Sequence, residues 1–187
     1  MSSLARQLLI LTSGIALLAI GLPHLLPFSL LRLAPLISST VNLMWAADEY
    51  MFLSAWLPAA YRTDADALLP RWFRVWGPMG SLVLFSSFPF SLGAAIANLL
   101  TSRDTSAAVG AAKWYWAGLV FTTAHFGYAP RALRLLKAIR KGKEEGGDPT
   151  GSMRRWIGMH LLRVVTADLP AFLCFATAVL SAMRVVA

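Results

Sequence analysis

The sequence contains few charged residues. Asp, Glu, Lys and Arg make up 14% of its 187 residues, whereas about a quarter is usual in soluble domains. Hydrophobic residues make up 57%, the mean hydropathy is +0.61, and no polar half or low-complexity segment interrupts the chain. These values exclude an ordinary soluble domain and predict a single membrane domain over residues 1–187.

Cysteine and histidine are also scarce. The single cysteine, Cys174, lies in an apolar run, which excludes an intrachain disulfide and predicts a small buried side chain. No His-x-x-His or Glu-x-x-His pair places two metal ligands on one helical turn. We therefore expect neither a metal ion nor another cofactor. The alternative is a mixed nitrogen and oxygen metal site, for which the candidate ligands are His125, His160, Asp48, Glu49 and Asp168.

Basic residues outnumber acidic ones, and the formal net charge is +8. A basic patch is one mark of a nucleic-acid-binding protein. Here, however, Lys and Arg gather between apolar segments, as they do in the cytoplasmic loops of membrane proteins. The expected partner is therefore the lipid bilayer, with no nucleic acid.

Five apolar segments are candidate membrane spans, at about 8–22, 36–60, 75–100, 112–130 and 156–183. The predicted fold class is all-α, a polytopic transmembrane helix bundle with five spans. We expect the first segment to be retained. The alternative is a cleaved signal peptide, which would leave four spans.

Lys and Arg are unequally divided between the two sides of this arrangement. Most of them lie in the N-terminus, in a loop expected at 62–74 and in the basic segment 131–155. Because cytoplasmic segments carry the excess of Lys and Arg, these three segments are predicted to be cytosolic. Segment 131–155 is expected to begin with a helix that continues the fourth span. The C-terminus is then lumenal or exoplasmic, and the endoplasmic reticulum or another endomembrane is the expected location.

The last span, Trp156–Met183, carries His160, Arg163 and Asp168. Ionisable groups at membrane depth cost about 2.5–3.5 kcal/mol each and are usually functional. Asp48 and Glu49 lie in the middle of the second span. Two such carboxylates beside one arginine leave a negative charge, which a proton or a cation would balance. This predicts acid/base chemistry; the alternative is that the charges only hold helices together.

Helical rise converts sequence position into membrane depth, at about 1.5 Å per residue. One layer, nearer the cytosolic side, is expected to contain His125, His160 and Arg163. A second layer, near the midplane, is expected to contain Asp48, Glu49 and Asp168. Arg163 is long enough to reach both layers. These six residues are the candidate catalytic groups.

Aromatic residues accompany the candidate site. Trp45 and Trp56 share a helical face with Glu49, and Phe121 and Tyr128 share one with His125. These four aromatic residues are the candidate substrate contacts. Three further tryptophans are expected in the interface belt of a membrane protein: Trp114, Trp116 and Trp156.

From about residue 40 onward, the order of features resembles the DUF1772 family of small membrane proteins, which includes fungal anthrone oxygenases. The matching pieces are Phe121–Lys137, FTTAHFGYAPRALRLLK, and the order of four residues in the last span: Trp156, His160, Arg163 and Asp168. That family has four spans, so segment 8–22 departs from its pattern. The Asp48–Glu49 pair is a second departure.

The resemblance implies an endomembrane enzyme that acts on aromatic polyketides or similarly apolar natural products. Cofactor-free oxygenation of an anthrone requires a base that removes an acidic C–H proton, after which the carbanion passes an electron to dioxygen. By this resemblance, His125 or Glu49 would be the base. Arg163 or His160 would stabilise the enolate oxygen.

The predicted function is an integral membrane oxygenase of secondary-metabolite biosynthesis, acting on a lipophilic polyketide- or terpenoid-like molecule. One alternative is a redox-neutral cyclase or isomerase, in which a carboxylic acid protonates the substrate and aromatic rings shelter the cation. Another is a non-enzymatic scaffold or partner subunit. The sequence leaves the oligomeric state open.

Overall fold

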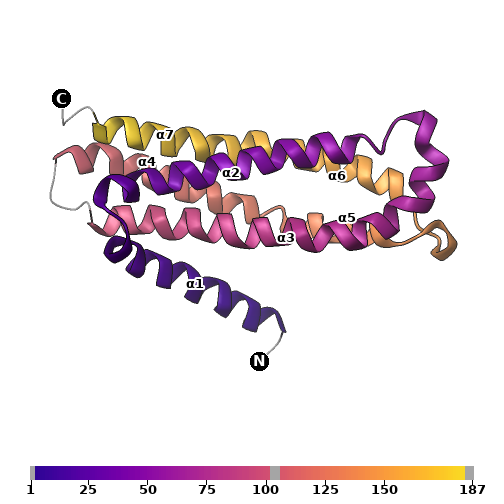
Figure 1. Cartoon of the computed structure of the whole chain (residues 1–187), viewed down its shortest axis with the longest axis horizontal. Coiled ribbons are helices and arrows are strands. Elements are labelled where there is room, and N and C mark those ends of the chain that lie inside the picture. Colours follow the sequence, from indigo (N-terminus) through magenta and orange to yellow (C-terminus); the bar gives the residue numbers. More distant parts are fainter. Residues whose placement is uncertain (1–2, 102–105, 184–187) are drawn as a thin grey trace.

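The computed structural model describes residues 3–101 and 106–183, and every regular element in these ranges is helical (Figure 1). The long elements are α1 (Ser3–Leu25), α2 (Phe28–Ser54), α3 (Arg62–Thr101), α4 (Ser106–Phe126), α5 (Ala129–Arg140), α6 (Pro149–Arg163) and α7 (Leu169–Met183). Between α6 and α7 lies a single π-helical turn, Val164–Asp168. Short 3-10 turns occupy Ala59–Tyr61 and Lys143–Glu145. The prediction of an all-α fold is confirmed.

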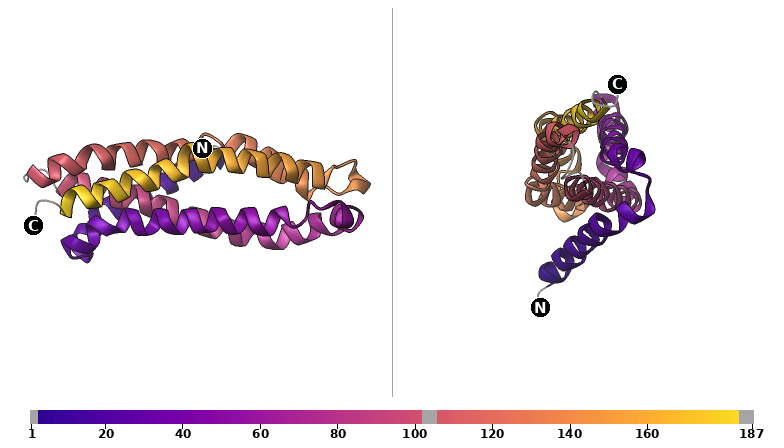
Figure 2. Two further views of the ribbon diagram at one scale, coloured as in Figure 1. Left: turned by 90° about the horizontal axis from the view of Figure 1, so that it is seen from above. Right: turned by 90° about the vertical axis from the view of Figure 1, so that its left-hand side faces the viewer.

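Four parallel or antiparallel rods make up the bundle. They are α2, α3, α4 with its continuation α5, and the long rod from α6 through the π turn to α7 (Figure 1). The end-on view shows α1 leaving the bundle at an angle (Figure 2). α1 packs on α3. Gly93 lies at this contact, and a Cβ at its position would collide with Leu18.

The two ends of the bundle differ in their connections. The α2–α3 and α5–α6 connections lie at the same end, on the right in Figure 1. There Asp66 in the first turns of α3 pairs with Lys143 at 2.6 Å and accepts a 2.7 Å hydrogen bond from the Thr150 hydroxyl at the start of α6. The α1–α2 connection and the end of α7 lie at the opposite end.

Three helices are long and apolar enough to cross a membrane: Phe28–Ser54, Thr63–Thr101 and Pro149–Met183. Leu9–Leu25 is a shorter apolar helix. Large apolar side chains face outward along the rods, for example Leu82 on α3 and Val165 in the π turn. These features make the protein membrane-associated, while the count of five spans stays a prediction.

The expected loop 62–74 is helical, whereas segment 131–155 begins with a helix, as expected. α3 begins at Arg62 and not near residue 75, so the basic segment 62–74 is the first part of a 40-residue helix. At about 60 Å, this helix is twice as long as the hydrocarbon layer of about 30 Å is thick. Segment 131–155 contains most of α5 and the start of α6. α6 begins at Pro149 because Asp148 caps it, accepting a hydrogen bond from the Gly151 amide.

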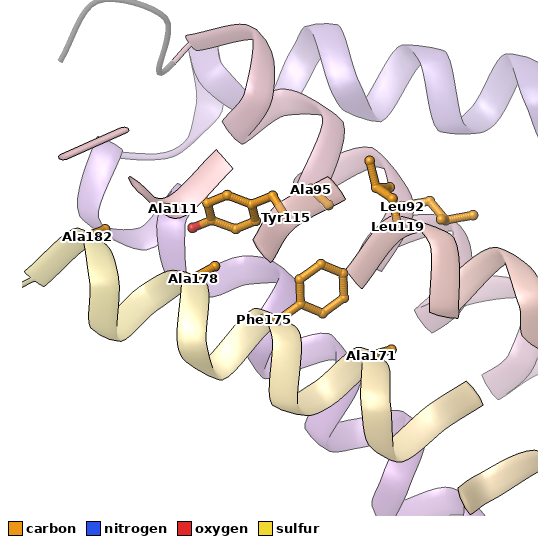
Figure 3. Close-up of a cluster of buried hydrophobic side chains, with 9 residues drawn as sticks. All are labelled: Leu92, Ala95, Ala111, Tyr115, Leu119, Ala171, Phe175, Ala178 and Ala182. Carbon is orange, nitrogen blue, oxygen red and sulfur yellow. The ribbon is translucent and has the colours of Figure 1, made fainter. Parts of the chain in front are cut away.

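Three apolar clusters are buried among the described residues, and the smallest joins α1, α2 and α3 around Leu22 and Leu31. Another joins α3, α4 and α7 around Phe175 (Figure 3). The Phe175 ring packs directly against Gly118, a position at which any side chain would overlap it. The third lies toward the α2–α3 connection and is centred on Phe73, Met153 and Ile157. The buried ionisable residues of α2, α4 and α6 lie between the Phe175 cluster and the Phe73 cluster.

Candidate active site

Five ionisable side chains from four elements meet inside the bundle. Glu49 comes from α2, His125 from α4, His160 and Arg163 from α6, and Asp168 from the π turn. All five are buried, with at most 9% of each residue exposed. We call this set the polar cluster.

A histidine–aspartate pair forms one half of the polar cluster. Nδ1 of His125 lies 2.7 Å from Oδ1 of Asp168, a hydrogen bond in which the ring nitrogen donates to the carboxylate. No described residue forms a hydrogen bond with Nε2 of His125, so this nitrogen can take or give a proton. The ring is held against Phe88, with 4.0 Å between the ring centroids. An aspartate that orients a histidine in this way is the arrangement used in general acid/base catalysis.

Arg163 connects that pair to the other half of the polar cluster. Its Nη2 donates a 2.7 Å hydrogen bond to Nδ1 of His160 and lies 3.5 Å from Oε2 of Glu49. Its Nε lies 3.7 Å from Oδ2 of Asp168. The guanidinium therefore bridges both carboxylates of the expected midplane layer and His160 of the expected cytosolic layer. The prediction that the two layers are separate is wrong, because His125 is hydrogen-bonded to Asp168. Nε itself has no hydrogen-bond partner among the described residues.

His160 is a neutral ring in this arrangement. Its Nδ1 accepts from Arg163, so the proton resides on Nε2, which donates to the Ala46 carbonyl at 2.9 Å. The indole of Trp156 stacks on the ring at 4.9 Å with an interplanar angle of 11°. His160 thus fixes the guanidinium and ties α6 to α2.

The π turn explains how Asp168 reaches the polar cluster. Residues five apart in an α-helix point about 140° away from one another, which would separate Asp168 from Arg163. Here the Leu169 amide bonds to the Val164 carbonyl, closing a wider turn, and such turns occur often at functional sites. Pro170 favours this widening because it has no N–H for the Thr166 carbonyl.

The charges of the polar cluster do not cancel when both histidines are neutral. Glu49 and Asp168 are two carboxylates, and Arg163 is the one guanidinium between them. An uncompensated charge in a buried site is costly. One additional proton balances the cluster. On a carboxylic acid, this proton leaves His125 neutral and able to act as a base; on His125, it makes the ring a proton donor.

Asp48 lies apart from this site. It is half-buried and has neither a hydrogen bond nor an ion pair with any described residue. Neighbouring residues on a helix point about 100° apart, so only Glu49 of this pair faces α6. The two adjacent carboxylates therefore do not act together.

The four candidate substrate contacts occupy different places. Trp45 is one helical turn before Glu49, and its ring stacks on Trp76. Trp56 lies near the end of the bundle that holds the α2–α3 connection and contacts Trp72. The remaining two lie on and after α4.

On α4, Phe121 packs against the core that contains Phe175. Tyr128 follows α4, and its hydroxyl is 2.7 Å from the Thr166 hydroxyl in the π turn. The expectation that Trp156 belongs to an interface belt is wrong: it is 3% exposed because it stacks on His160, whereas Trp116 is 61% exposed.

Some contributors to the site were not expected. Phe88 lies on α3, a helix that contributed none of the candidate residues, and the main-chain carbonyl of Ala46 leaves no trace in a sequence pattern. The described residues contain no group of three or more His, Cys, Asp or Glu that could hold a metal ion. The expectation of a cofactor-free site stays a prediction.

Comparison with known proteins gives a consistent set of fungal relatives. The chain is 39% identical to epoxidase pydX of Acremonium sp over 158 residues, which cover 84% of this chain and 97% of that protein. It is 42% identical to the probable epoxidase scpX of Mollisia scopiformis over 154 residues, 82% of this chain and 96% of that protein. The chain belongs to the family of these fungal epoxidases. A further member, epoxidase gkaX of Penicillium citrinum, is 34% identical over 82% of this chain and 95% of its own length.

A more distant relative of the family is the oxaleimides biosynthesis cluster protein N of Penicillium oxalicum, 26% identical over 85% of this chain and 93% of that protein. No family profile matches the chain, and no solved structure matches it. The epoxidase relatives support an oxygenase-like enzyme of biosynthesis.

Proposed function

We propose that this protein is an integral membrane epoxidase, which adds one oxygen atom to a carbon–carbon double bond of a lipophilic natural-product precursor. The observation that carries the proposal is the buried His125–Asp168 pair bridged by Arg163 in a chain whose relatives are named epoxidases. The apolar surface of the rods suits a polyketide- or terpenoid-like substrate that enters from the bilayer.

In the proposed reaction, Nε2 of His125 removes an acidic proton from the substrate. Asp168 holds the ring in the required tautomer and stabilises the positive charge that it acquires. Arg163 stabilises the negative charge that forms on the substrate oxygen. These are the roles expected from the resemblance to DUF1772 proteins, with His125 as base in preference to Glu49.

Dioxygen is the proposed oxidant. The carbanion passes one electron to dioxygen, and the substrate radical and superoxide then combine to a peroxide anion. Transfer of its distal oxygen to a double bond of the substrate gives the epoxide and leaves the proximal oxygen as an alkoxide, which takes a proton from His125. Both atoms of dioxygen are then in the product, and no external reductant is consumed.

The same proposal includes a topology. The chain crosses the membrane five times, with the end that holds the α2–α3 and α5–α6 connections in the cytosol and the end of α7 in the lumen of the endoplasmic reticulum. The basic first part of α3 and the basic helix α5 lie toward the same end, which supports this orientation.

The test is conversion of an olefinic precursor by membranes that contain the protein, under ¹⁸O-labelled dioxygen. We expect an epoxide that carries the label, and a rate lower by about 10²–10⁴-fold for His125→Gln. Asp48→Asn is the matched control, because Asp48 has no bond to the described residues, and it should keep the full rate.

Two results would overturn the proposal. An isomer of the precursor without added oxygen would identify the protein as a cyclase or isomerase. Full activity of a folded His125→Gln variant would remove the acid/base role of the polar cluster.

A further inference from the structure

Four tryptophans form a continuous row between α2 and α3. The ring of Trp45 is 5.8 Å from that of Trp76, at an interplanar angle of 12°. Trp76 is 5.3 Å from Trp72 at 13°, and Trp72 is 5.5 Å from Trp56 at 51°. We call Trp45, Trp76, Trp72 and Trp56 the tryptophan ladder.

The ladder begins at the polar cluster. Trp45 precedes Ala46, whose carbonyl accepts the hydrogen bond from His160, and it lies one helical turn before Glu49. Gly80 makes room for the first stack, because a Cβ there would lie 3.1 Å from Cζ2 of Trp45. The backbone of α3 is thus adapted to this ring.

The ladder ends at the surface. Trp56 lines a recess with Thr150, Gly151 and Arg154 at the end of the bundle that holds the α2–α3 connection. Trp56 lies eleven residues after Trp45, just beyond the end of α2, and a helix of that length would span about 16 Å. Electron transfer over this length in a single step is slow, whereas transfer between neighbouring rings is fast because each step is short.

Packing alone does not account for this row. Aromatic pairs gain about 0.5–1.5 kcal/mol in either offset-stacked or edge-to-face geometry, so packing selects neither repeated parallel stacks nor an unbroken row. Indole is also among the protein side chains that lose one electron most readily. The row joins a buried oxygenase site to an exposed basic recess, which is what an electron-transfer route requires.

We propose that the tryptophan ladder conducts oxidising equivalents from the polar cluster to a water-soluble, anionic one-electron donor that binds beside Arg154. The proposal rests on the proposed oxygenase function, because that reaction supplies the oxidant. A substrate radical that escapes recombination with superoxide adds a second dioxygen molecule and becomes a peroxyl radical, while the superoxide leaves the site. The peroxyl radical takes one electron from Trp45 and one proton from the polar cluster and becomes a hydroperoxide.

Electrons then move in the opposite direction to the positive charge. The Trp45 radical cation takes an electron from Trp76. Trp76 is then reduced by Trp72, and Trp72 is reduced by Trp56. The donor reduces Trp56 and is itself oxidised by one electron. Each such event consumes one electron from the donor and one proton, and it restores every indole.

A photochemical experiment tests the ladder without substrate. A ruthenium photo-oxidant is attached to Ala55→Cys, an exposed position beside Trp56, in a Cys174→Ser background. Trp45→Tyr places a trap at the buried end, and Trp45→Phe in the same labelled protein supplies the matched background from the native tyrosines. After a flash, we expect a tyrosyl radical absorption in the Trp45→Tyr protein that exceeds the background.

The ladder is then interrupted in the middle. Adding Trp76→Phe should reduce the additional tyrosyl signal at least severalfold, whereas Trp116→Phe, an exposed tryptophan outside the ladder, should leave it unchanged. Circular dichroism and elution volume verify that each variant is folded. An additional signal that survives Trp76→Phe, or that never forms with the ladder intact, overturns the proposal.

This outcome is independent of the proposed function. If conduction is observed but no epoxide forms with labelled dioxygen, the ladder stands and the reaction is a different one. If epoxide forms but the trap is never oxidised, the oxygenase stands and the ladder has no electron-transfer role.

Discussion

Arg163 is the residue on which the polar cluster depends. It is 6% exposed and contacts Glu49, His160 and Asp168. Removing one partner from a buried ion pair leaves the other charge uncompensated, which costs about 3–5 kcal/mol. The consequences of this removal depend on how many negative charges are left behind.

Arg163→Met should lower the thermal unfolding temperature strongly, because Glu49 and Asp168 then face one another without a cation. Glu49→Gln alone should change the unfolding temperature little, since one guanidinium and one carboxylate remain and their charges balance. The double variant should recover most of the loss, which differential scanning fluorimetry in detergent would measure. If Glu49→Gln lowers stability as much as Arg163→Met does, the charge count given for the cluster is wrong.

Two elements hold this cluster in place: the π turn and the α4–α7 contact. The π turn directs Asp168 toward His125, while Gly118 lets α4 approach α7 closely enough for that pair to form. Small residues allow this kind of close approach between membrane helices. Catalytic geometry here is therefore a property of helix contacts as much as of the ionisable residues.

Gly118→Ala should destabilise the protein because a Cβ at this position overlaps the Phe175 ring. The expected loss is about 1–3 kcal/mol, the usual cost of overpacking, accompanied by reduced activity as His125 moves. Gly110→Ala on the same helix is the control. Nothing lies within 4 Å of its new Cβ, so it should keep or raise stability. Equal thermal stability of the two variants would refute this account of the contact.

At the scale of the whole molecule, the bundle has two different ends. One end holds both long connections, the Asp66–Lys143 ion pair and most of the basic residues. The opposite end holds the α1–α2 connection. This asymmetry is the physical basis for the proposed orientation, since Lys and Arg are retained on the cytosolic side.

Cysteine labelling in sealed microsomes tests the orientation. In a Cys174→Ser background, Glu144→Cys on the α5–α6 connection should react with a membrane-impermeant maleimide. Ser29→Cys, near the start of α2, should react only after detergent is added. Both positions are exposed, so accessibility within the fold does not decide the result, and the reverse pattern would invert the proposed topology.

Composition alone determined the class of this protein. A low charge content and long apolar segments exclude a soluble fold, because a backbone in lipid must satisfy its hydrogen bonds internally and so becomes helical. Helical rise placed His125 and Arg163 at similar depths, but the separate midplane layer expected for Asp168 is wrong, because Asp168 is hydrogen-bonded to His125. Arg163 contacts His160 of the first expected layer and Glu49 and Asp168 of the second.

Only the tertiary structure decided which of the candidates face one another. Sequence spacing gives depth and helical face, but it does not give the rotation of one helix against another. That rotation excludes Asp48 and includes Glu49, and it buries Trp156 on His160. It also aligns three tryptophans of α2 and α3 with Trp56 in the connection between them. The π turn is likewise a departure from helical periodicity that no periodic pattern predicts, and without it Asp168 would point away from the residues it serves.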